Sequence, residues 1–208
     1  VWQDAALVYH MNEDPSSGGT GDIKDSSPEQ NNGTPTNMDA GDLVSSCQVG
    51  TCLEFNEGGT DDESVQSVNS LWNPVNTEYT VTVWANWQDD GNMDPALFSP
   101  EGAAMFGAND SSGVLMIDSN NGGKEFGSTA TGNTFNLRGG TSTLTTWYHI
   151  ALRCDGVDTC YLYADATSVA SHTASIVEST AKALIAYPRV PDDTHEEFRG
   201  MIDEIQVF

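Results

Sequence analysis

The chain has 208 residues, a length that one β-rich domain often reaches, so a single domain over residues 1–208 is expected. It carries 31 acidic residues against 7 basic ones, a formal net charge of −24, and such a surface repels nucleic-acid backbones and anionic lipid. We therefore expect no nucleic-acid partner. We also expect no direct membrane insertion, because no apolar run approaches the roughly 20 residues of a membrane helix.

Short runs of β-branched and aromatic residues, separated by Gly, Asn, Asp and Ser, predict a series of short strands. A first apolar run at 5–11 precedes a polar stretch over 12–46 that can hold only short strands. Further strands are expected, in chain order, at 52–55, 63–68, 79–87, 96–99, 103–106, 114–118, 134–137, 147–153, 161–164, 181–186 and 201–208. About a dozen such strands are enough for two stacked sheets.

The clearest alternation lies in the strand expected at 79–87. One face carries Tyr79, Val81, Val83, Ala85 and Trp87. Because side chains alternate along a strand, Trp84 belongs to the other face.

In the last expected strand, alternation places Asp203 on one face with Met201, Ile205 and Val207. An unpaired buried carboxylate is costly, so Asp203 needs a partner: a metal ion, backbone N–H groups or an arginine. We expect this strand to pair with the run at 5–11, which would close a sandwich with its own terminal strands.

The four cysteines form two close pairs, Cys47 with Cys52 and Cys154 with Cys160, and each pair flanks a short turn. Cysteines that face each other across such a turn can be bridged, so two local disulfides are expected. A zinc site built from all four is the alternative, although neither spacing has the two-residue interval usual for structural zinc. Two disulfides indicate an oxidising compartment, so the protein is expected to be secreted, periplasmic or on the cell surface.

Six blocks then suggest a family: LVYHMNED, the polar run over residues 25–34, TVTVWANW, TWYHIALRCDG, YLYAD and FRGMIDEIQVF. In this order they resemble the laminin-G-like jelly-roll domains of the concanavalin A-like lectin/glucanase superfamily, and most of all its bacterial surface-protein branch. The resemblance covers essentially the whole chain. It implies an all-β, antiparallel two-sheet jelly-roll β-sandwich that is one module of a larger surface protein.

Enzymatic activity is not expected, although the superfamily includes glucanases. Retaining glycosidases need two carboxylates about 5 Å apart, which alternate residues of one strand would supply. The adjacent acids Asp203 and Glu204 point to opposite faces of their strand, and the remaining acid pairs lie in expected turns. His149 is expected to be a buried, hydrogen-bonded strand residue rather than a base.

The resemblance also implies a structural Ca²⁺ ion where the terminal strands meet a neighbouring loop. It nominates Asp203, with main-chain carbonyls near His10 and Asn12 and near Glu57 and Gly58. Asp25 is a weaker candidate. The alternative is that Asp203 simply accepts backbone hydrogen bonds.

The segment from Asp89 to Asp94 is a second calcium candidate, because its oxygen-bearing side chains alternate as in a calcium loop. It lacks the closing glutamate of an EF-hand, and a solvated hairpin turn is the alternative.

Sugar binding is the commonest non-catalytic activity that the resemblance implies. It needs an aromatic platform with polar groups beside it to read the hydroxyls. The candidates are Trp87 with Asp90 and Asn92, Trp72, and Phe106 with Asn109 and Asp110. Each aromatic ring could instead belong to the core.

We therefore expect a calcium-binding, lectin-like module of a secreted or cell-surface adhesin. Its partners would be glycans or polysaccharide and neighbouring domains of the same polypeptide. Two alternatives remain open: a structural or protein-interaction module of a surface protein or fibre, and an accessory domain of a polysaccharide-degrading enzyme.

Overall fold

The computed structural model describes residues 2–56, 63–71, 78–88, 96–100, 115–118, 125–130, 134–157, 159–173, 182–187 and 198–208. Its elements are β1 (Leu7–Tyr9), β2 (Gly33–Thr36), the 3₁₀ turn η1 (Ala40–Asp42), β3 (Leu43–Ser45), β4 (Thr51–Phe55), β5 (Ser64–Ser67), β6 (Glu78–Trp87), β7 (Ala96–Pro100), β8 (Leu115–Asp118), β9 (Glu125–Ala130), β10 (Thr134–Gly139), β11 (Trp147–Asp155), β12 (Thr159–Ala164), β13 (Thr167–Thr173), β14 (Ala183–Ile185) and β15 (Gly200–Val207). Within these ranges no helix has the length and apolar character needed to cross a bilayer.

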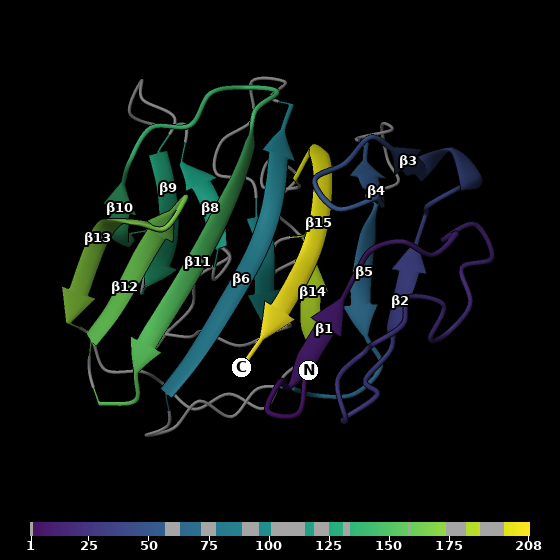
Figure 1. The fold of residues 1–208 in the computed structure, drawn as a ribbon, viewed down its shortest axis with the longest axis horizontal. Helices are drawn as coiled ribbons and strands as arrows, with labels where there is room; N and C mark the ends of the chain where they lie inside the picture. Colours follow the sequence, from purple (N-terminus) through teal and green to yellow (C-terminus); the bar gives the residue numbers. More distant parts are fainter. Residues whose placement is uncertain are drawn as a thin grey trace.

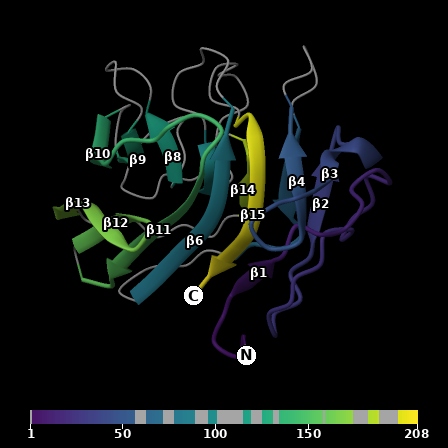
Figure 2. The same cartoon turned by 45° about the horizontal axis from the view of Figure 1, so that its top comes forward.

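The strands form two antiparallel sheets that stack as layers (Figures 1 and 2). The larger sheet has the order β13-β12-β11-β6-β15-β4-β3, with β1 also paired to β15. The smaller sheet has the order β10-β9-β8-β7-β14-β5-β2. This architecture confirms the expected antiparallel two-sheet jelly-roll β-sandwich.

The core lies between the two sheets and is built from the inward residues of each strand. On β6 the five residues predicted to share a face, from Tyr79 to Trp87, are all buried in it. Ile150 and Leu152 of β11 join them, and Phe98 and Phe126 contribute from the smaller sheet. Full burial of one such large apolar side chain stabilises the fold by about 1.5–3 kcal/mol, so the core is the main source of stability.

The strand β15 lies in the middle of the larger sheet. One of its edges pairs with β6, and the other pairs first with β4 and then with β1, where Leu7 lies opposite Val207. The expected pairing of the terminal strands is therefore confirmed. Gly200 permits the close approach to β6, since a Cβ there would lie 2.2 Å from the carbonyl oxygen of Asn86.

The predicted alternation of β15 is wrong, because the strand contains a bulge. The register with β6 shifts between Asp203 and Gln206, and Glu204 has a positive φ of 53°. One extra residue reverses the phase of a strand. Ile202 and Ile205 therefore both point into the core, whereas Asp203 lies on the outer face.

Two strands, β9 and β13, have no counterpart among the strands that the sequence predicts. Neither segment has a clear apolar alternation, which is the pattern on which such a prediction depends. The short strands β2 and β3 lie within the polar stretch over 12–46, in agreement with the expectation of short strands there. The strand expected at 103–106 falls outside the described residues.

Candidate functional site

The outer side of the larger sheet, onto which Figure 1 looks, carries a group of partly exposed rings. They project from β6, β11 and β12 at positions that alternate with core residues: Trp84, Trp147, His149, Tyr161 and Tyr163. We call the outward residues of these three strands the aromatic face. Each ring is there because its neighbours in sequence point into the core, so the parity of the strand leaves it outside.

Two of the rings form a contact pair. Trp84 lies directly opposite His149 in the ladder, and the ring centroids are 5.0 Å apart with planes tilted by 51°. The backbone N–H of His149 donates to Asp165 Oδ1 at 2.9 Å. Burial lowers the pKa of His149, and the nearby Asp165 carboxylate opposes this only in part. The imidazole is therefore neutral at pH 7, and the pair presents an uncharged, largely apolar surface.

A buried amide lies beside these rings. Asn86 is two residues from Trp84 on the same face and lies opposite Trp147, and only 5% of it is exposed. Its Oδ1 has no hydrogen-bond partner among the described residues. A buried acceptor without a donor is rare in folded proteins.

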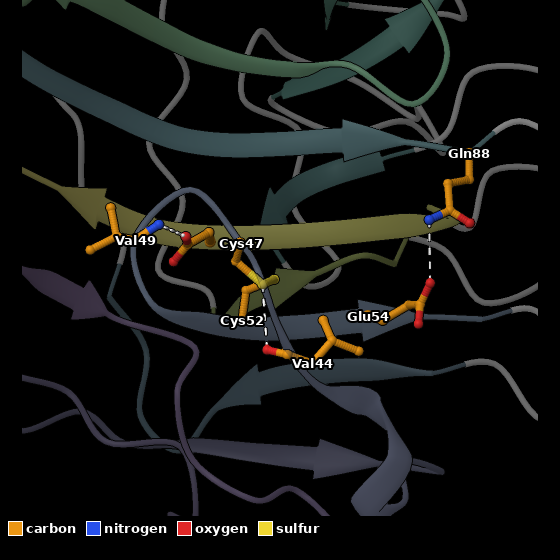
Figure 3. The surroundings of a disulfide bond; sticks show 7 residues. Val44, Cys47, Val49, Cys52, Glu54 and Gln88 are labelled. Carbon is orange, nitrogen blue, oxygen red and sulfur yellow. Dashed lines mark hydrogen bonds between the residues drawn. A yellow bond between two sulfur atoms is a disulfide. The ribbon is translucent and has the colours of Figure 1, made fainter.

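A disulfide loop borders the face on the side of β15 (Figure 3). Cys47 and Cys52 are bridged, and the loop between them lies over β15. The backbone N–H of Val49 donates to Asp203 Oδ2 at 2.7 Å, and Val49 itself is 54% exposed. Since Asp203 lies opposite Trp84 in the ladder, the loop forms a rim beside that ring.

Both expected disulfides are confirmed. The second bridge joins Cys154 and Cys160, which lie directly opposite each other on β11 and β12. The hydroxyl of Tyr79 donates to Cys154 Sγ at 2.8 Å. Because all four sulfurs are consumed in two bridges, the zinc alternative is excluded.

Asp203 is fully buried, and its two oxygens differ. Oδ2 accepts the Val49 bond, whereas Oδ1 has no partner among the described residues. The pKa of this carboxyl is raised to about 6 in total. Burial is the main cause, the hydrogen bond from the N–H of Val49 opposes it, and the negative charge of Glu204 adds to it. Glu204 itself contacts His10, with Oε1 and Nδ1 2.8 Å apart. Oδ2 of Asp203 thus accepts a backbone hydrogen bond, as the alternative to a calcium ligand predicts. Oδ1 is left for a proton or a cation.

The other predicted calcium ligands are only partly brought together. His10 follows β1 and contacts the neighbour of Asp203, while Asn12 is exposed further along the chain. Gly58, Asp89 and Asp94 lie outside the described residues. In the part of the chain that the structure describes, no group of three or more His, Cys, Asp or Glu side chains is arranged around a common point.

Asp25 has a role that the sequence does not reveal. Its Oδ1 accepts from the N–H groups of Val8 and Ser27, both at 2.8 Å. Its Oδ2 accepts from the Ser27 hydroxyl and the N–H of Asn31, both at 2.7 Å. Four donors fill the lone pairs of a carboxylate, so Asp25 ties β1 to the 25–31 loop and has no oxygen lone pair left for a metal.

Of the predicted sugar-binding residues, the structure describes only Trp87, and it lies in the core. Trp87 is 3% exposed and packs in the core, so its ring cannot serve as a platform; strand parity places it with Val81 and Val83. The remaining candidates lie outside the described residues: Trp72, Asp90, Asn92, Phe106, Asn109 and Asp110. The partly exposed tryptophan of β6 is Trp84, and the alternation of the strand is the signal that could have identified it as the outward ring.

A separate hollow of about 420 Å³ lies near the N-terminal segment. It is lined by residues 3–6, by Glu29 and Asn31, and by residues 69–71. The side chain of Asn31 fixes its walls, since Nδ2 donates to the carbonyl of Asn69 and Oδ1 accepts from its N–H. None of the aromatic-face residues lines this hollow.

Comparison with known families decides the classification. Residues 57–208, well over half of the sequence, match the laminin-G-type family model of the concanavalin A-like lectin/glucanases superfamily. The chain belongs to this superfamily. A search of curated proteins found no match.

Three solved structures have a fold similar to that of this chain. Domain 4 of AbnA, an extracellular GH43 arabinanase from Geobacillus stearothermophilus in complex with arabinotriose, has a TM-score of 0.59 at 14% identity, over 98% of this chain and 91% of that one. A mutant Trypanosoma rangeli sialidase has a TM-score of 0.56 at 14% identity, over 90% of this chain and 27% of the sialidase. The binding domain of botulinum neurotoxin serotype G has a TM-score of 0.59 at 11% identity, over 99% of this chain and 47% of that domain. The chain thus spans about a quarter of the sialidase, and at these identities the likeness shows the fold alone.

Proposed function

We propose that this domain is a non-catalytic carbohydrate-binding module and that the aromatic face is its binding surface. The observation that carries the proposal is the partly exposed Trp84, which lies beside Asn86 with its unpartnered, buried Oδ1. A pyranose stacks its C–H face on an aromatic ring, while its hydroxyls need acceptors such as this amide. In this proposal the ring of Trp84 is the contact at the surface, and a sugar hydroxyl reaches the buried amide oxygen only after a neighbouring ring changes rotamer.

The fold likeness is consistent with such a role. The matched domain of the arabinanase was solved with arabinotriose, and it is similar in size to this chain. That domain is one part of a larger extracellular enzyme, which supports the proposal that this chain is also a module beside other domains.

The non-catalytic part of the proposal rests on the acids of the face. A retaining glycosidase needs two carboxylates about 5 Å apart across its substrate. Among the described outward residues of β6, β11 and β12, no two acids occupy alternate positions of one strand. Glu78 and Asp155 lie opposite each other on neighbouring strands, but at the end of the ladder, six residues along β6 from Trp84, where Glu78 contacts Arg153.

We further propose that the module is extracellular and part of an adhesin, and that it binds Ca²⁺ near Asp203. Two disulfides are typical of secreted domains. The partner-free Oδ1 of Asp203 supports the cation, because a buried carboxylate oxygen is costly without one. In this proposal the ion stabilises the seam between β15 and β1, and it is not itself the sugar receptor.

A glycan array run with and without EDTA tests the function. Trp84→Ala should lose every hit of the wild type, whereas Glu29→Gln, which alters only the separate hollow, should retain them. Both variants should keep the melting temperature within a few degrees, since Trp84 is not a core residue. An array without hits for the folded wild type would refute carbohydrate binding, and hits that depend on Glu29 would move the site to the hollow.

A further inference from the structure

We propose that the aromatic face selects neutral, unbranched polysaccharide chains and discriminates against anionic glycans. This inference rests on the proposed function and specifies its ligand. It is carried by the spacing of the rings, by the shape of the surface around them and by the charges that surround it.

The rings are too far apart to serve a single sugar. Trp84 and Tyr163 are separated by two strand spacings across the sheet and by one pair of residues along it. With strands about 4.8 Å apart and about 6.8 Å for two residues, their backbone positions lie about 12 Å from each other. Tyr161 lies one further pair along β12. Such a span contacts successive sugars of one chain.

The surface is closed on one side and open on the other. The disulfide loop held by Asp203 forms the rim beside Trp84. Beyond β12, the residues of β13 that pair with the two tyrosines are Ser168 and Ser171, both small and exposed. A chain can therefore start against the rim and run out over β12 and β13, where the described residues beyond the two tyrosines are small. A side branch at the rim would meet the loop.

The charges on this face are predominantly negative. Arg153 is the basic residue of the three strands, and its Nη2 lies 3.6 Å from Glu78 Oε1, so its charge is locally balanced. Asp155, Asp165 and Glu204 add three further carboxylates around the rings: the first two accept backbone hydrogen bonds, and Glu204 contacts His10. A uronate or sulfated chain would bring repeated negative charges within a Debye length of these carboxylates, on a protein whose net charge is −24. A neutral chain meets no such repulsion.

The test is affinity electrophoresis against matched polymers that share a backbone but differ in charge. One pair is hydroxyethylcellulose and carboxymethylcellulose, and the other is methyl-esterified polygalacturonate and its de-esterified form. We expect retardation by neutral polymers and binding to the charged partner of each pair that is about tenfold weaker at low salt, with the difference shrinking as salt screens the charges. Trp84→Ala should abolish retardation. Tyr163→Ala and Tyr161→Ala should reduce binding of long oligosaccharides while leaving short ones nearly unchanged.

Three results separate the possible failures. Tighter binding of carboxylated than neutral polymers would overturn the inference while the carbohydrate-binding function stands. Affinity that does not rise with oligosaccharide length would overturn the extended-chain part. If no neutral polymer binds, the inference fails, and the glycan array then decides whether the proposed function fails with it. Glu29→Gln is the matched control throughout, because it removes a carboxylate away from the face.

Discussion

Replacing Asp25 by Ala should destabilise the domain strongly, and the size of the effect follows from its four hydrogen bonds. The change leaves the N–H groups of Val8, Ser27 and Asn31 without their acceptor, and all three residues are buried. A buried donor that loses its partner costs about 1–3 kcal/mol. Water entering the vacated space offsets part of this, so we expect a loss of about 4 kcal/mol, a large share of the roughly 5–15 kcal/mol typical of a domain.

Urea denaturation followed by tryptophan fluorescence measures this loss, in calcium and in EDTA. Ser27→Ala is the matched control, because it removes one donor to Oδ2 and the long 3.3 Å bond from the N–H of Glu29 but leaves the three backbone donors to Asp25 in place, and it should cost about 1 kcal/mol. The loss in Asp25→Ala should be the same in both buffers, since protein donors fill the carboxylate. A cost below about 1 kcal/mol, or one confined to the calcium buffer, would refute the structural role and restore Asp25 as a metal ligand.

Three further outcomes are expected. Trp87→Ala should cost about 3–5 kcal/mol of stability. Trp84→Ala should weaken glycan binding by at least about thirtyfold, or about 2 kcal/mol, which is enough to remove the array hits and the retardation, with little change in the urea midpoint. Equal effects of a substitution on stability and on binding would contradict the assignment of the two faces. The pKa of Asp203 in the folded state, about 6, exceeds the ordinary value of 3.8, so the folded state holds the proton more tightly than the unfolded chain. In EDTA, the free energy of unfolding should therefore fall by up to about 3 kcal/mol as pH rises from the lower to the higher of these values. Asp203→Asn should flatten this dependence of stability on pH. Removing the Cys154–Cys160 bridge by a double Ala substitution should cost about 2 kcal/mol and leave binding intact, as thermal melts and the array would report.

Alternation along the strands predicts the faces correctly where the ladder is regular and incorrectly where it is not. On β6 every residue assigned to the apolar face is in the core. On β15 the bulge after Asp203 reverses the phase, and no residue type marks it: Glu204 adopts a positive φ without being glycine. The choice of Trp87 as a platform is wrong for a simpler reason, because its own face is the apolar one.

The candidate site is harder to predict because it depends on partners that are distant in sequence. Trp84 faces His149 through the pairing of β6 with β11, and this register cannot be read from either segment alone. The N–H groups of Val8 and Val49 reach Asp25 and Asp203 across long sequence separations. The disulfides are predictable because each closes a short local turn.

The central position of β15 has a consequence for how the domain is made. The strands β1, β4 and β6 are synthesised early, yet the larger sheet joins them only through β15, which is synthesised last among its members. Until it emerges, β6 and β4 keep open edges, and the native contacts that remain to be formed are long-range ones, which form slowly. The nascent chain therefore cannot complete this sheet until the residues of β15 have been synthesised.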